Sequence, residues 1–137
     1  MRRLLLAWVS LTNGWFIFTL AKAILPALTS LGLGQAVAAA MRPSIAWNIF
    51  QLVVLVAGIA LEFRKARTAF IPNVGFYVMM FFWSIGSVTA DLLGWLDTSG
   101  MALRFLLSLG LPCLGIAVIN GLLYAYVSRE AAADRDA

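Results

Sequence analysis

The sequence contains no histidine and only one cysteine, Cys113. The absence of histidine removes the most common metal ligand and the most common general base of enzymes. A single cysteine cannot form a disulfide or a dithiol redox centre within the chain. No P-loop and no dinucleotide-binding glycine motif is present. The sequence therefore predicts a protein that is not an enzyme and has no cofactor or metal. A membrane enzyme that uses Asp91 as acid or base is the weakest alternative.

Charged residues are also scarce. They make up 12% of the 137 residues, whereas a soluble domain has roughly 25%. Hydrophobic residues make up 63%. Too few polar residues remain to cover a soluble fold, so the composition predicts one domain embedded in a membrane. The net charge of +4 does not indicate nucleic-acid binding, because the basic residues lie between apolar runs and not along one helix face.

Uncharged apolar runs predict four membrane spans. A helix needs about 20 apolar residues to cross the hydrocarbon core, and the runs 43–61, 68–90 and 105–128 meet this requirement. The stretch before them is interrupted only by Lys22, without a turn that reverses the chain, so it predicts a single span. The expected fold is an all-α polytopic helical bundle of residues 1–137. It has spans at about 4–25, 44–62, 70–96 and 103–127, a broken or interfacial segment at about 27–42, and a frayed tail at 129–137.

The distribution of basic residues predicts the orientation of these spans. With four spans and a cytoplasmic N-terminus, seven cations lie inside and three outside, as the positive-inside rule requires. The inner set is Arg2, Arg3, Arg64, Lys65, Arg67, Arg129 and Arg135, and the outer set is Lys22, Arg42 and Arg104. A model with five spans reverses this bias. In the preferred arrangement with four spans, the C-terminus is cytoplasmic, like the N-terminus.

The stretch "EFRKAR", residues 62–67, becomes the inner turn between the second and third spans. Arg64, Lys65 and Arg67 are predicted to contact anionic lipid headgroups at the inner face. Glu62 lies one turn before Lys65, which predicts a local surface ion pair between these two residues. The turn therefore predicts membrane lipid as a partner of the chain.

Small residues recur at a spacing of four in the last two spans. Such stripes let helix backbones approach closely, which predicts that spans three and four pack against each other. The alternative is that one stripe forms a homo-oligomer or joins a larger membrane complex. Pro112 is expected to disturb the fourth span by leaving the carbonyl of Ser108 without a donor. The predicted packing residues are Gly86, Ala90, Gly94, Ala117, Gly121 and Ala125, with Cys113 on the same stripe.

Five polar residues from four spans are expected near the outer end of the bundle. They are Lys22, Asn48, Gln51, Asp91 and Arg104. Polar groups that face lipid lack partners, so these side chains are predicted to point inward, where they would form a polar pocket open to the periplasm. The other interpretation is structural: an interfacial cluster of ion pairs and hydrogen bonds, in which the two long cationic side chains extend into the headgroup layer. Asn120, deeper in the fourth span, is expected to bond to a neighbouring helix.

Short motifs along the chain resemble a known family. They are "NGWFIFTLAKAILP", Trp47, "FRKARTAFIP", Asp91, Arg104 and the pair Ser128-Arg129. Together they are similar to the small four-span bacterial membrane proteins catalogued as DUF2569. The resemblance implies a location in the bacterial inner membrane. Because the function of that family is unknown, it implies no reaction.

Two classes of function fit these patterns. The first is an accessory subunit or scaffold that acts through helix–helix contacts. The second is a protein that binds or transports a small molecule, ion or lipid through the outer polar pocket around Asp91. A large cavity around Asp91 would favour the second function, whereas a filled bundle with Asp91 already paired would favour the first.

Overall fold

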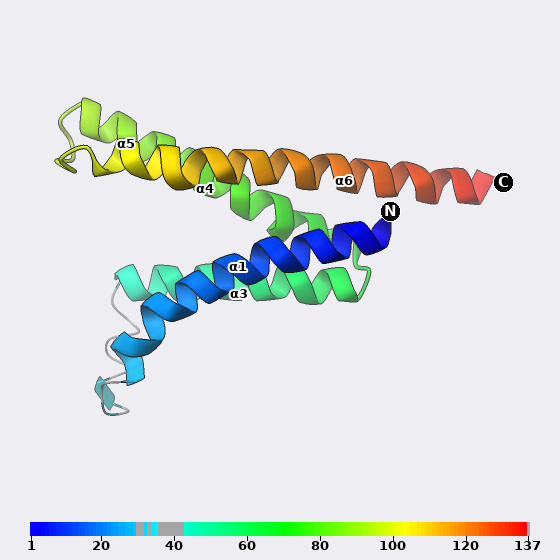
Figure 1. Ribbon diagram of the computed structural model, residues 1–137, viewed down its shortest axis with the longest axis horizontal. Coiled ribbons are helices and arrows are strands. Elements are labelled where there is room, and N and C mark those ends of the chain that lie inside the picture. Colours follow the sequence, from blue (N-terminus) through cyan, green and yellow to red (C-terminus); the bar gives the residue numbers. More distant parts are fainter. Residues whose placement is uncertain (30–31, 33, 36–42, 137) are drawn as a thin grey trace.

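The computed structural model describes residues 1–29, 32, 34–35 and 43–136, and these residues form helices and turns without any strand. The long helices are α1 (Arg2–Thr29), α3 (Pro43–Phe63), α4 (Phe70–Leu92) and α6 (Leu111–Asp136) (Figure 1). A 3-10 turn (Arg67–Ala69), the short helix α5 (Met101–Phe105) and a π-helical segment (Leu106–Gly110) complete the order. Four stretches are long and apolar enough to cross a membrane, which confirms the predicted all-α bundle with four spans.

The helices pack as two pairs. α1 lies along α3, and α4 lies along α6, while α3 and α4 join the pairs through the turn at 64–69 (Figure 1). The predicted contact between spans three and four is thus the contact between α4 and α6. The N-terminus, the α3–α4 turn and the C-terminal end of α6 lie at one end of the bundle. We call this end the turn end.

Helices α3 and α4 end in the same backbone motif. After α4, Gly94 N donates to Asp91 O and Trp95 N donates to Ala90 O, with Gly94 in the left-handed region at φ +73°. This Schellman arrangement ends a helix and favours glycine. It stops α4 at Leu92, four residues before the predicted end at 96. The prediction extended too far because apolar composition alone does not reveal where the backbone reverses.

The α3 end repeats this motif with a lysine. Lys65 N donates to Glu62 O, and Ala66 N donates to Leu61 O, each at 3.0 Å. Lys65 therefore occupies the left-handed position, at φ +54°. For a residue with a Cβ atom, this conformation costs roughly 1–2 kcal/mol. The chain holds a cationic side chain at a position where glycine is more stable.

Helix α6 departs from regular geometry where Pro112 predicts a disturbance. Residues Leu106–Gly110 are π-helical, and Leu111 N donates to Leu106 O, five residues earlier. Because Pro112 has no N–H, the backbone here cannot keep the regular α-helical ladder. Beyond this point α6 continues to Asp136, so the predicted frayed tail at 129–137 is wrong over the described residues 129–136. Three consecutive alanines, the best helix formers, favour helix in this tail.

The segment between the first two spans is described only in part. α1 continues past the predicted end at 25 to Thr29, with Pro26 inside it. The predicted broken or interfacial segment at 27–42 otherwise falls largely outside the described residues, of which only 32 and 34–35 belong to it beyond the end of α1.

The bundle has an apolar exterior and a mixed interior. Side chains such as Trp15, Phe18 and Phe82 are more than 60% exposed along the spans. The interior combines a small apolar cluster, centred on Phe76, Tyr77 and Cys113, with fully buried asparagines. A soluble protein cannot expose this much apolar surface, whereas lipid covers it without cost. The fold is therefore that of an integral membrane protein.

Candidate functional site

The predicted outer pocket divides into separate groups. Lys22 on α1 and Arg104 on α5 are exposed. Gln51 is buried and Asn48 half-buried on α3. The α1–α3 pair and the α4–α6 pair diverge toward the end of the bundle opposite the turn end (Figure 1). The elements that carry Lys22 and Arg104 therefore lie apart. The structure does not bring the five side chains together.

Asp91 has a local partner at the end of α4. Its Oδ1 accepts a hydrogen bond from Thr98 N at 2.9 Å, within the loop that leads to α5. A hollow of about 500 Å³ beside the neighbouring Ala90 is lined mainly by apolar residues such as Phe82, Trp83 and Leu96 and does not include Asp91. Asp91 holds the backbone of its own loop by this local hydrogen bond and does not join Lys22 and Arg104 in the interfacial cluster of the structural interpretation. The geometry therefore does not favour a ligand site around this carboxylate.

A network of buried amides crosses the middle of the bundle instead. Asn13 on α1 and Asn73 on α4 have no exposed surface. Asn13 Nδ2 donates to Asn73 Oδ1 at 2.8 Å and to Leu55 O at 3.2 Å. Tyr77 OH donates to Asn13 Oδ1 at 2.8 Å.

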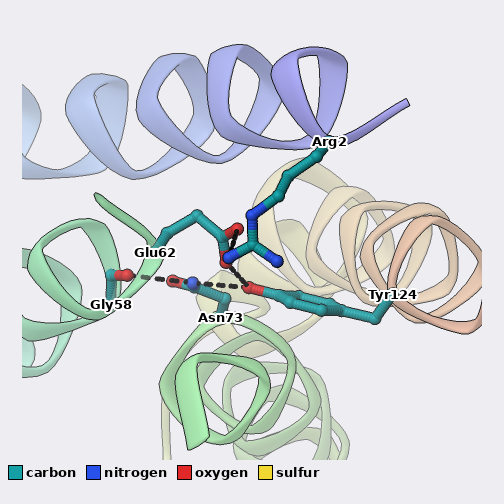
Figure 2. A network of polar contacts seen from close by, with 5 residues as sticks. All are labelled: Arg2, Gly58, Glu62, Asn73 and Tyr124. Carbon is teal, nitrogen blue, oxygen red and sulfur yellow. Dashed lines mark hydrogen bonds and ion pairs between the residues drawn. The ribbon is translucent and has the colours of Figure 1, made fainter. Parts of the chain in front are cut away.

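Asn73 also connects this network to α3 and α6. Its Nδ2 donates to Gly58 O at 3.0 Å and to Tyr124 OH at 2.9 Å (Figure 2). From α6, Asn120 Nδ2 donates to the carbonyl oxygen of Asn73 itself, and Trp8 Nε1 donates to Asn120 Oδ1 at 2.9 Å. The expected contact of Asn120 with a neighbouring helix is confirmed. One amide network thus joins all four spans.

The network reaches charged groups at the turn end. Tyr124 OH donates to Glu62 Oε2 at 2.6 Å, and Arg2 Nη2 lies 3.5 Å from Glu62 Oε1 (Figure 2). Glu62 is only 2% exposed, so it is not the surface residue predicted. The predicted local pair with Lys65 is wrong, because the Glu62 side chain turns into the bundle toward α1 and α6. No hydrogen bond reaches Oε1 among the described residues, and its charge is balanced by the Arg2 guanidinium.

Gly58 lets the network form. A Cβ atom added there would overlap the side-chain amide of Asn73 and lie 3.0 Å from Asn13 Nδ2. Gly110, the last residue of the π-helical segment before α6, makes a similarly close contact with α4, because an added Cβ would overlap the Ser84 side chain. These two glycines make close helix contacts that the sequence patterns did not assign to them.

The predicted packing stripe is only partly at the α4–α6 contact. Ala117 is buried in the core with Cys113. Ala125 is exposed, and Gly94 is in the loop beyond α4. Gly86 and Gly121 have no neighbouring atom within 4 Å of an added Cβ, so the prediction that they form the close contact is wrong. A strict spacing of four drifts by about 40° per step around a helix with 3.6 residues per turn, so the buried face of α6 passes through Cys113, Ala117 and Asn120 and leaves Gly121 and Ala125 beside it.

The amide network and the charged turn end have different chemistry. The network donors and acceptors are already satisfied by one another and leave no group for a substrate. At the turn end, by contrast, Arg64, Lys65 and Arg67 are exposed, as the predicted lipid contact requires. Among the described residues, no group of three His, Cys, Asp or Glu side chains is placed to hold a metal ion. The turn end is therefore the better candidate for binding.

One signal in the sequence pointed to the network. Asn13, Asn73 and Asn120 are isolated polar residues within apolar runs, and such residues bond to other helices because lipid offers no partner. Their mutual positions depend on the rotation of each helix. Comparison with known proteins found no protein family, no curated protein and no solved structure that matches this chain.

Proposed function

We propose that this chain acts as a non-enzymatic accessory or scaffold protein that binds a further membrane-spanning helix along α4. The observation that carries this proposal is a stripe on one face of α4, where two glycines have no neighbouring atom within 4 Å of an added Cβ. The stripe consists of Gly75, Met79, Phe82, Gly86 and Ala90. Intervals of three and four residues place them on one helix face.

Two apolar hollows lie over this stripe and meet at Met79. One has a volume of about 500 Å³ and is lined by Gly86 and Ala90, among others. The other, of about 440 Å³, is lined by Gly75 together with residues of α3 such as Ala57 and Val53. Glycine and alanine at the base of a groove allow another helix backbone to approach closely, and this is how helices associate in lipid. We call this surface the α4 groove.

The variants Gly75→Leu and Gly86→Leu test the α4 groove. Each leucine would fill the space that a docking helix needs, so association should fall. Overpacking an interface typically costs about 1–3 kcal/mol, which is roughly 5- to 150-fold in affinity. The measurement is the mass of the complex in mild detergent, for self-association, and the yield of co-purifying membrane proteins, for another partner.

The matched control for the α4 groove is Gly115→Leu. Gly115 also has no atom within 4 Å of an added Cβ. It lies on α6, however, and it does not line the α4 groove. All three variants should keep the thermal stability of the parent protein. Equal association of all three variants would refute the proposal for the α4 groove.

We further propose that the chain lies in the bacterial inner membrane with both ends and the α3–α4 turn in the cytoplasm. The excess of cations at the turn end supports this orientation. The position of both chain ends beside that turn agrees with an even number of crossings (Figure 1). The resemblance to the four-span bacterial family agrees with the choice of membrane.

Cysteine labelling tests this orientation. In a Cys113→Ser background, Thr68→Cys and Met101→Cys place an exposed thiol at opposite ends of the bundle. An impermeant reagent added from the periplasm should label Met101→Cys within minutes and leave Thr68→Cys unlabelled until the cells are opened. Labelling of Thr68→Cys in intact cells would reverse the orientation.

A further inference from the structure

Four cations from separate parts of the chain line one hollow at the turn end. Its volume is about 450 Å³, and its basic residues are Arg2, Lys65, Arg67 and Arg135. They come from the start of α1, the α3–α4 turn and the end of α6. Tyr124 and Val127 form part of its wall. We call this site the basic hollow, and its size lies within the roughly 300–1,000 Å³ of small-molecule sites.

The cations of the basic hollow exceed the acidic groups beside them. The ion pair recorded among the described residues is Arg2–Glu62, so the one buried carboxylate here is matched by one guanidinium. On α6, Ser128, Ala131 and Arg135 recur at intervals of three and four residues and face the hollow. Glu130 falls on a different face of the helix by the same spacing. Asp134 adjoins Arg135 in the sequence but does not line the hollow. With Arg2 paired to Glu62, the lining still carries three further cations and no carboxylate among the described residues.

The backbone at Lys65 is a second observation that points to a ligand. Lys65 lies in the left-handed region, whereas the equivalent position after α4 is Gly94. The turn motif alone favours glycine, so the cationic side chain is present at a cost to the stability of the turn. Lys65 lines the basic hollow and also a neighbouring hollow of about 310 Å³ with Arg3 and Glu62. A residue with a strained backbone conformation thus lines the basic hollow.

We propose that the basic hollow binds the phosphate group of an anionic phospholipid. Arginine forks match phosphate oxygens in pairs, and lysine adds a compact positive charge. The site lies at the ends of the spans, where headgroups are found, and Val127 beside the cations offers an apolar wall to the glycerol region. Basic pockets between spans bind lipid headgroups for these reasons. The inference does not depend on the α4 groove.

The bound phosphate joins parts that Glu62 also connects, through its contacts with Arg2 and Tyr124. It would contact α1 through Arg2, the turn through Lys65 and Arg67, and α6 through Arg135. A ligand that binds only the folded state raises the free energy of unfolding by RT ln(1 + c/Kd), where c is the concentration of free ligand. Anionic lipid should therefore raise the unfolding temperature of the purified protein, and phosphatidylcholine should not.

The test uses two double variants of equal charge. Arg67→Gln with Arg135→Gln removes two cations of the basic hollow. Arg104→Gln with Arg129→Gln removes two exposed cations that are not among the predicted lipid contacts, and neither lines the hollow. Binding is measured in phosphatidylcholine vesicles with and without phosphatidylglycerol, by lipid retention in native mass spectrometry and by the unfolding temperature. Each cation removed from the site should weaken binding about 5-fold, and the pair about 30-fold.

The outcomes separate the site from general surface charge. Loss in the first double variant alone supports the basic hollow. Equal loss in both, or in neither, overturns it. Inorganic phosphate is tested in parallel. If it alone reproduces the stabilisation and the variant pattern, the site recognises a soluble phosphate group and the lipid source is refuted.

Lys65→Gly distinguishes binding from folding. In phosphatidylcholine alone this variant should be as stable as the parent protein or more so, because glycine suits the left-handed position. It should nevertheless bind phosphatidylglycerol about 5-fold more weakly. Unchanged binding would mean that Lys65 only closes the turn, which contradicts its assigned role.

Discussion

Replacing Asn73 with alanine is expected to destabilise the protein strongly. Asn73 accepts a hydrogen bond from Asn13 and donates to Gly58 O and Tyr124 OH. Its removal leaves one N–H of the fully buried Asn13 amide without its acceptor. A buried unsatisfied group costs about 1–3 kcal/mol, to which the cavity left by the amide adds. The measurement is the free energy of unfolding in detergent, from titration with a denaturing detergent.

The control for this variant is Thr19→Ala. Thr19 is exposed, and its hydroxyl donates to the carbonyl of Trp15 in the same helix. Its removal should change the free energy of unfolding by less than about 0.5 kcal/mol. Tyr124→Phe should fall between the two, because it removes the donor to Glu62 but keeps the ring. If Asn73→Ala and Thr19→Ala were equally mild, the amide network would not hold the four spans together.

Alanine at Gly58 is expected to have an effect of the opposite sign to alanine at Gly86. At Gly58 the new Cβ overlaps the Asn73 amide, so either the Asn73 side chain leaves its hydrogen bonds or α3 and α4 separate. Overpacking of this kind costs about 1–3 kcal/mol, and any loss of the Asn73 hydrogen bonds adds to it. At Gly86 the Cβ meets no atom within 4 Å, and alanine is the better helix former by up to about 1 kcal/mol.

Unfolding measurements on the two alanine variants provide the comparison. Gly110→Ala should behave like Gly58→Ala because of its contact with Ser84, and Gly115→Ala should behave like Gly86→Ala. A series in which all four variants changed stability in the same direction would contradict the assigned close contacts. The decisive result is whether the free energy of unfolding rises or falls in each variant, whatever the size of the change.

The spans and the neighbouring arrangement of α4 and α6 could be predicted from the sequence, because they depend on local composition. A charge-free apolar run long enough to cross a bilayer has no soluble alternative in a chain of this composition, and a short connection places consecutive spans side by side. The ends were less predictable. The end of α4 depends on the backbone angle at Gly94, and the tail after Ser128 is helical through alanine content despite its polarity.

The partners of individual side chains could not be predicted in the same way. Glu62 was assigned to Lys65 because the two are close in sequence, yet it contacts Tyr124, 62 residues away. That contact depends on the rotation of α3 about its axis, which is set by the close approach at Gly58. Likewise, Asp91 and Lys22 share a depth in the membrane without sharing a neighbour. The position of a residue along its span follows from the sequence, whereas the neighbours of its side chain follow from how the helices pack.

The last helix has a practical consequence for experiments on this small protein. The continuous helical stretch Met101–Asp136 contains 36 residues and is about 54 Å long, well beyond the roughly 30 Å of a bilayer core. Its final turns extend past the N-terminus of α1 (Figure 1). A soluble helical protein fused in phase after Asp136 would therefore be carried on a stiff rod at a fixed angle. Such a fusion would give electron microscopy a rigid marker outside the micelle.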